Sequence, residues 1–178
     1  MNLNTYNSVC MHLKKKKAVN KFQHKNTKKI TSIKSTTLNI KNNTVDIKTL
    51  AKSFFALELL VFKHSKPVLT KKQSISLKLK KKQPIGCLVV MKKMTANLFL
   101  SKTLEILPKT KVVILTKPGF NSFEMSLHNI TQFSELEEYY SVFKNLQLNI
   151  SVNLTAKNKN ENLFFLKMHK IPLKLLQM

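Results

Sequence analysis

Hydrophobic and polar residues alternate in several short stretches of the chain, which is the pattern of strands with one buried face. The most regular stretch is residues 146–154 (LQLNISVNL), where every second residue is apolar. Two further runs, residues 87–91 (CLVVM) and 111–116 (KVVILT), are short, valine-rich and of strand length. Weaker alternation predicts strands over residues 35–40, 67–70 and 120–128.

Three stretches repeat apolar residues at helical spacing instead. In the first, Leu50, Phe54 and Leu57 mark a buried face, and Asp46 can cap its start. The second follows Lys93 and stops at Pro108, and the third covers residues 158–168. The resulting order, β-α-β-β-α-β-β-β-α, predicts an α+β domain with helices on one face of a mixed or antiparallel sheet. The other face is then free for a partner.

The charge of the chain indicates what kind of partner this is. The 178 residues, enough for one domain, include 32 lysines, no arginine and 8 acidic residues, for a formal net charge of +24. Residues 1–117 carry 26 lysines and 3 acids, whereas residues 118–178 carry 6 and 5. Such a chain repels itself unless a polyanion neutralises it. Nucleic acid is the first candidate and an anionic membrane surface the second.

The composition also indicates an origin and a division of the chain. Abundant lysine and asparagine, with two glycines and no tryptophan, are typical of an A/T-rich gene of a mitochondrion, another organelle or a reduced bacterium. No apolar run is long enough for a transmembrane helix. Residues 1–34 form a basic N-terminal arm, compatible equally with a short helix and with a segment that orders on RNA. Residues 35–178 are expected to form a single α+β RNA-binding domain.

The chemistry-bearing residues match no catalytic or metal-binding pattern. Glu135, Glu137 and Glu138 form the only acidic cluster, and their spacing favours a solvated or partner-facing patch over a metal site. The five histidines are scattered, and two glycines cannot build a phosphate-binding loop. We therefore expect no enzymatic activity, no cofactor and no small-molecule substrate.

The segment from Lys66 to Lys82 is the most basic part of the predicted domain. It could be a solvated loop or a segment that contacts phosphates. Its run of like charges contains no acidic residue, and this favours phosphate contact. Four aromatic residues of the basic part are expected in the core: Phe54, Phe55, Phe62 and Phe99. Without free rings for base stacking, structured RNA recognised by its shape, backbone and hydroxyl groups is the favoured partner.

Several segments, taken in order, resemble one family. Pro84-Ile85-Gly86-Cys87 opens a strand that leads into a Met-containing helix ending at Leu107-Pro108. Segments 37–40 (TLNI), 66–71 (KPVLTK), 121–127, 133–136 (FSEL), 148–157 (LNISVNLTAK) and 161–172 keep the same order. Together they resemble the bacterial-type large-subunit ribosomal protein five over residues 33–173. The chain departs from that family where Ser76-Leu77 replaces an Ala-Gly-Phe turn, and in a shorter loop after the central helix.

The resemblance implies a five-stranded, mostly antiparallel sheet with helices packed on one face. It implies a structural role in translation, in the central protuberance of the large subunit of a mitochondrial ribosome, with rRNA and, where present, 5S rRNA as partners. The implied rRNA-binding residues are Thr37, Asn39, Lys41, Lys66, Thr70, Lys71, Lys72, Lys92 and Lys93. The loop implied to face the peptidyl-site tRNA contains Gln73, Ser74, Ser76, Lys78, Lys80, Lys81 and Lys82. The bridge implied to a protein of the small-subunit head contains Lys111, Lys117, Asn121, Glu135, Glu137 and Glu138.

Two other functions are compatible with the charge. A non-ribosomal basic RNA-binding protein or RNA chaperone would bind many RNAs with little preference. A peripheral membrane protein would need an amphipathic helix whose exposed apolar face is flanked by lysines. We expect the apolar helix faces to be used in the core, so no membrane contact is predicted, and the expected location is the ribosome of the mitochondrial matrix.

Overall fold

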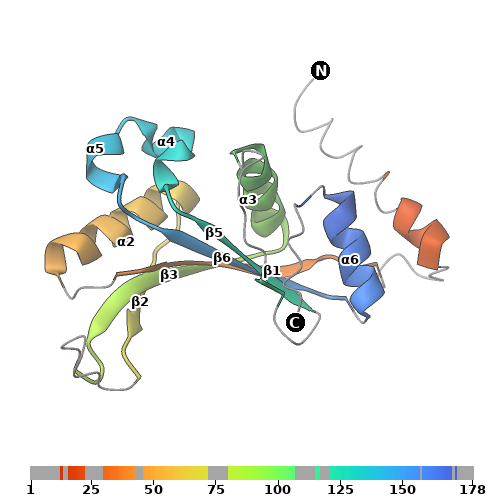
Figure 1. Cartoon of the computed structure of the whole chain (residues 1–178), viewed down its shortest axis with the longest axis horizontal. Helices are drawn as coiled ribbons and strands as arrows, with labels where there is room; N and C mark the ends of the chain where they lie inside the picture. Colours follow the sequence, from red (N-terminus) through yellow and green to blue (C-terminus); the bar gives the residue numbers. More distant parts are fainter. Residues whose placement is uncertain are drawn as a thin grey trace.

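The computed structural model describes residues 13, 16–22, 30–42, 46–71, 80–106, 115–116, 121–156, 158–169 and 171. Within them, helices and an antiparallel sheet form one α+β unit (Figure 1). The strands are β1 (Ile33–Lys41), β2 (Lys66–Leu69), β3 (Pro84–Lys92), β4 (Leu115–Thr116), β5 (Ser122–Leu127) and β6 (Leu148–Leu154). The helices are α2 (Ile47–Val61), α3 (Lys93–Ile106), the 3-10 helix η2 (Ile130–Gln132), α4 (Ser134–Glu137), α5 (Tyr140–Phe143) and α6 (Lys159–Met168).

The sheet has the strand order β2-β3-β1-β6-β5-β4, and every neighbouring pair is antiparallel. The strand β1 lies in the middle, where Leu38 is opposite Val89 of β3 and Ile150 of β6. The two-residue strand β4 adds a sixth strand to the five that the resemblance implies. The expected fold class, an α+β domain with an antiparallel sheet, is confirmed.

One face of the sheet is covered by helices and contains the core. Figure 1 shows α2, α3, α4 and α5 on the same side of the strands. Alternate residues of β1, β5 and β6 point to that side, and Leu38, Met125 and Ile150 are fully buried there. Each such side chain contributes about 1.5–3 kcal/mol when it leaves water. The alternation seen in the sequence therefore has the expected cause, which is a sheet buried on one face.

The helix α2 has the start that the sequence predicts. The Asp46 side chain accepts hydrogen bonds from the backbone N–H of Lys48 (3.2 Å) and from the Thr49 hydroxyl (2.9 Å). The helix ends at Phe62, whose backbone is left-handed (φ 53°) and whose N–H donates to the Glu58 carbonyl (2.7 Å). Local hydrogen bonds therefore mark both the first and the last turn of α2.

The structure differs from the expected elements in two places. The strand β3 begins at Pro84 rather than Cys87, because Gly86 and Pro84 pair with β2 on the outer side. The segment between Ile130 and Phe143 forms the short elements η2, α4 and α5, which were not predicted. Each of these elements has three or four residues, which is too short to show a helical period. The strand expected over residues 111–116 is described only at β4, and the rest of it lies outside the described residues.

Residues 16–22 of the expected arm form a helix, drawn in red in Figure 1 beside α6. Residues 1–12, 14–15 and 23–29 lie outside the described part, so the full extent predicted for the arm is not tested. Within the described ranges, no helix combines the length and the apolar character needed to cross a bilayer.

Candidate nucleic-acid interface

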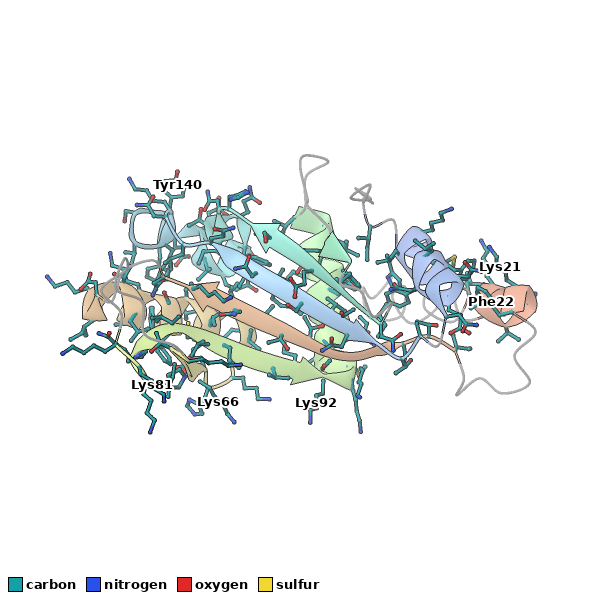
Figure 2. All side chains as sticks on the ribbon, turned by 60° about the horizontal axis from the view of Figure 1, so that its bottom comes forward. Lys21, Phe22, Lys66, Lys81, Lys92 and Tyr140 are labelled. Carbon is teal, nitrogen blue, oxygen red and sulfur yellow. The ribbon has the colours of Figure 1, made fainter. Side chains whose placement is uncertain are left out.

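The face of the sheet opposite the helices carries small polar side chains. On β1 these are Ser35, Thr37 and Asn39, all only partly exposed, and they alternate with core residues. The neighbouring strand β6 contributes Asn149, Ser151 and Asn153 in the same way. Figure 2 looks onto this surface, with the helices behind the strands. We call it the open face.

The strand register arranges the open face in rows. Asn39 is opposite Asn149 of β6 on one side and Leu88 of β3 on the other. The same row continues to Lys66 of β2, which is opposite Leu88, and to Ser126 of β5, which is opposite Asn149. A single row thus runs from a lysine at one edge, through Leu88 and two asparagine side chains, to a hydroxyl near the other edge.

Hydrogen bonds between neighbouring strands hold several of these side chains in place. The Ser126 hydroxyl donates to Asn149 Oδ1 (2.7 Å), and the Ser151 hydroxyl donates to Glu124 Oε1 (3.1 Å). In the adjoining row, Asn153 Nδ2 donates to Ser35 Oγ (3.2 Å). Side chains positioned before a ligand arrives lose less conformational entropy on binding.

Asn39 is the exception on this face. Its side-chain oxygen is buried and has no hydrogen-bond partner within the described structure. A buried acceptor without a donor typically costs about 1–3 kcal/mol. A ligand that displaces the side chains covering this oxygen and brings a hydroxyl or amino group to it would recover that cost. Asn39 was predicted from the sequence as an rRNA contact, and its placement is compatible with that prediction.

Exposed lysines line one edge of the open face. Lys66 on β2 and Lys92 on β3 lie along this edge together with Lys81, as Figure 2 shows. Lys41 at the end of β1 is also exposed. No acidic residue occurs in β1, β2 or β3. The single acid of β5, Glu124, lies on the open face near its opposite edge, where it accepts the Ser151 hydroxyl. We call this row of lysines the lysine edge.

Thr70 closes the base of the basic loop that follows β2. Its side chain is buried, its hydroxyl donates to the Lys80 carbonyl (2.5 Å), and the Gln83 N–H donates back to that hydroxyl (2.9 Å). The backbone N–H of Thr70 also donates to the Gln83 carbonyl (2.9 Å). Thr70 was expected to contact rRNA, but the structure gives its hydroxyl an internal role.

The bonds around Thr70 bring the two ends of the loop together. They place the exposed residues Lys71 and Lys80 at its base, followed by the exposed Lys81 and Lys82. The other residues expected in this part of the interface are Lys72, Gln73, Ser74, Ser76 and Lys78, and they lie outside the described residues.

Lys93 is the first residue of α3 and directly follows the last residue of β3. Its side chain is exposed, and its backbone has a positive φ of 51°, which a non-glycine residue rarely adopts. The carbonyl of the preceding Lys92 accepts a hydrogen bond from Thr95 Oγ1 (2.9 Å). The junction of β3 and α3 therefore carries two exposed lysines at the end of the lysine edge.

The acidic residues expected at the bridge differ in how exposed they are. Glu135 is half-buried and forms an ion pair with Lys102 of α3, whereas Glu137 and Glu138 are exposed. Burial lowers the pKa of Lys102, and the nearby Glu105 opposes that shift. Among the described residues, no three His, Cys, Asp or Glu side chains are grouped so that they could hold a metal ion.

Asn121 is the other described member of the expected bridge. It is exposed, and its carbonyl accepts the Leu154 N–H (2.6 Å), which fixes the start of β5 against the end of β6. Lys111 and Lys117 lie outside the described residues.

Sequence reasoning missed part of the open face. Ser35, Ser126, Asn149, Ser151 and Asn153 were not chosen as candidates, although three of them share one side of the strand predicted with most regularity. The available signal was that every polar position of residues 146–154, Gln147 included, holds an amide or a hydroxyl. An exposed face that only needs solubility more often carries charged residues.

The expected core positions of the aromatic residues are only partly correct. Phe99 is buried and stacks on Phe133 at 5.7 Å between ring centroids. Phe55 and Phe62 are instead 54% and 84% exposed. Phe55 lies on α2 and Phe62 directly follows its last residue, both on the helix side of the sheet and away from the open face. The open face itself therefore still offers no described aromatic ring for base stacking.

The chain matches no protein-family model and no curated protein sequence. The functional assignment therefore depends on the geometry of the open face and on the residues that carry the resemblance.

Proposed function

We propose that this chain is a structural, non-catalytic rRNA-binding protein of the large subunit of a mitochondrial ribosome. The observation that carries the proposal is the open face: hydroxyl and amide groups on β1, β5 and β6 beside Leu88 and Val90 of β3, with the unpartnered oxygen of Asn39 among them and lysines along one edge. The segments that resemble the large-subunit ribosomal protein five include β1 and β3, and both strands are part of the open face.

In the proposed mechanism the lysine edge supplies affinity for RNA, and the open face supplies recognition of its shape and hydroxyl groups. The lysine edge neutralises backbone phosphates and releases counterions, which supplies affinity for any RNA. The open face then meets the shallow minor groove of an RNA helix, where 2′-hydroxyl groups and base edges are accessible. The buried acceptor of Asn39 favours a ligand that brings a donor, and the 2′-hydroxyl of RNA is such a donor. DNA lacks this group at the same position.

The resemblance extends the proposal to a place in the ribosome. In this reading the open face binds 5S rRNA, or another rRNA segment where 5S rRNA is absent, in the central protuberance. The loop that begins at Lys71 and ends at Lys82 faces the peptidyl-site tRNA. The exposed acids Glu137 and Glu138 meet a basic protein of the small-subunit head.

Sedimentation of a mitochondrial lysate tests this function. The chain is followed by an antibody or tag through sucrose gradients at moderate and then high salt, with magnesium present throughout. We expect it in the large-subunit fraction, released only together with other proteins of the central protuberance. A chain that stays at the top of the gradient would support a free RNA-binding protein or chaperone, and one that pellets with membranes would support a peripheral membrane protein. Either result contradicts the proposal.

A further inference from the structure

The helix at residues 16–22 is held against α6 by aromatic contacts. The rings of Phe22 and Phe164 meet edge to face with their centroids 5.3 Å apart. The Lys21 ammonium lies 4.7 Å from the centroid of Phe164, within the range of a cation–π interaction. Ala18, on the same helix, is buried. The first described helix and the last one therefore pack together at one end of the molecule (Figure 1).

Hydrogen bonds connect α6, on which this helix packs, to the sheet. Just before β1, the Ser32 N–H donates to Thr155 Oγ1 (2.9 Å), and the Thr155 N–H donates to the Ser32 carbonyl (2.9 Å). The Thr31 hydroxyl donates to Glu161 of α6 (3.3 Å). These bonds fix α6, and with it the docked helix, relative to the end of β1.

The docked helix presents cations without counter-charges of its own. Lys16 and Lys17 are exposed, and the helix contains no acidic residue. The single acid of α6, Glu161, is buried and already accepts the Thr31 hydroxyl. Lys167 of α6 is exposed at the same end.

The helix lies beyond the end of the lysine edge. Lys92 is opposite Ser35, and the preceding residue, Lys34, is exposed. Figure 2 shows Lys81, Lys66 and Lys92 along one edge of the sheet, and Lys21 farther along the same long direction of the molecule. A backbone that follows the lysine edge past Lys92 would therefore continue toward the docked helix.

We propose that the helix at residues 16–22, docked on α6 through Phe22 and Phe164, is a second phosphate-contacting site for the same RNA. Lys16 and Lys17 contact a backbone segment separate from the one on the lysine edge. This inference rests on the proposed RNA-binding function and adds a second, preorganised contact to it. The docked state matters because lysines on a positioned helix lose less entropy on binding than lysines on a free tail.

Two variants test the charge and the docking separately. Lys16→Gln/Lys17→Gln removes two exposed charges and leaves Lys21, Phe22 and Phe164 unchanged. Phe164→Ala keeps every charge and removes the ring on which the helix docks. Affinity is measured over a range of salt concentrations for two RNA hairpins, one with a stem of about one helical turn and one about three times longer.

With the long hairpin, we expect Lys16→Gln/Lys17→Gln to reduce the slope of log affinity against log salt by about 1.4–1.8, since each phosphate contact contributes about 0.7–0.9. We expect Phe164→Ala to lower affinity about two- to tenfold for the long hairpin. Neither variant should change binding of the short hairpin, which cannot reach both sites. The matched control is Lys48→Gln/Lys52→Gln, two exposed lysines of α2 on the helix side of the sheet, which should leave the slope unchanged.

The outcomes distinguish this inference from the function on which it rests. An unchanged slope in Lys16→Gln/Lys17→Gln, while Lys66→Gln/Lys71→Gln still reduces it, would overturn the second site and leave RNA binding by the sheet intact. An effect of the charge variant without any effect of Phe164→Ala would show a tethered charged tail and overturn the docked site. If Lys48→Gln/Lys52→Gln reduces the slope as much as Lys16→Gln/Lys17→Gln does, the attraction is non-specific, and this result would also overturn the second site. If the Lys66/Lys71 variant has no effect, the proposed interface itself fails.

Discussion

Asn39 shows how a single residue can be chosen by sequence and yet be explained only by structure. The sequence offers Asn39 as one polar position within a predicted strand. The structure adds that its oxygen is buried without a partner, while the amide of Asn149, opposite it in the same row, accepts the Ser126 hydroxyl. Two asparagines on one face thus have different expected roles, one in binding and one in stability.

Replacement of Asn39 should affect stability and binding in different directions. Asn39→Leu keeps the approximate size of the side chain and removes the unpartnered oxygen, so the free energy of unfolding should stay the same or rise. RNA affinity should fall about tenfold, because a hydrogen bond of about 1–1.5 kcal/mol to the ligand is lost. Urea unfolding and filter binding measure the two quantities.

Asn149→Leu is the matched control for Asn39. It leaves the Ser126 hydroxyl without its acceptor, so it should lower stability. If Asn39→Leu binds RNA as tightly as the unchanged chain, Asn39 is not part of the interface.

Cys87 is a residue whose chemistry follows from its position in the core. It is fully buried, and burial raises the pKa of its thiol to about 12, with a smaller contribution from Glu58. In a Cys10→Ser background, native protein at pH 8 should therefore react with a thiol reagent only after unfolding. A rapid reaction of the native chain in an Ellman assay would contradict the buried position.

The same thiol gives a pH dependence of stability. In the unfolded chain the thiol ionises near its ordinary pKa of 9.0, whereas in the folded chain it stays neutral up to about 12. The unfolded state therefore binds fewer protons above about pH 9, and this contribution to stability is lost as the pH rises toward 12. Below about pH 9 the contribution is fully present.

At the scale of elements, α2 shows where periodicity misleads. Ile47, Ala51 and Phe55 recur at intervals of four residues, yet all three are exposed, and the buried stripe is formed by Ser53, Ala56, Leu57 and Leu60. The sequence predicts Leu50, Phe54 and Leu57 on the buried face. Of these only Leu57 is fully buried, whereas Leu50 and Phe54 are partly buried. Apolar residues surround much of this helix, which makes its buried stripe hard to read from the sequence. Phe55 instead contacts Tyr139 and Phe143 with its ring, at centroid distances of 6.5 and 6.2 Å.

The pairing of β3 with β1 depends on Gly86. Gly86 is opposite Lys41, and a methyl group on its Cα would collide with the carbonyl oxygen of Ile40. Gly86→Ala should therefore force the two strands apart and lower the free energy of unfolding by about 1–3 kcal/mol. Urea unfolding at constant salt measures this change.

Val90→Thr is the matched control for Gly86, since Val90 lies on the same side of β3 and is partly exposed. Exchanging a methyl for a hydroxyl at this exposed position should shift stability by no more than about 0.5 kcal/mol. A Gly86→Ala protein as stable as the unchanged chain would show that the strands can separate at this point without cost.

At the scale of the whole molecule, charge and architecture divide the surface. The lysines of β2 and β3 and of the docked helix follow one long direction of the molecule, whereas the short helices α4 and α5 carry the exposed acids Glu137 and Glu138 near Tyr140. Exposed aromatic residues are typical of protein contacts, and exposed lysines are typical of phosphate contacts. The molecule thus has different surfaces suited to different partners.

The net charge should make stability depend on salt and on RNA. A chain of +24 repels itself, so raising the salt concentration should raise the melting temperature by screening that repulsion. Saturating RNA, at about 100 times its dissociation constant, should add about 2.7 kcal/mol of apparent stability. Thermal melts followed by circular dichroism give both effects, with an uncharged polymer as the control. A melting temperature insensitive to both salt and RNA would contradict the proposed neutralisation.

The sequence by itself determined the fold class and the principal strands and helices, because these depend on the period of apolar residues. Its summed charge led only to the expectation of a polyanionic partner. Asp46 as a cap and the alternation in β6 could be read locally, since each involves neighbours along the chain. Only the tertiary structure decided which residues share a surface. The row from Lys66 to Ser126, the internal role of Thr70 and the docking of Phe22 on Phe164 join residues far apart in sequence. Strand register and helix packing create these neighbours, and no local pattern of residues encodes them.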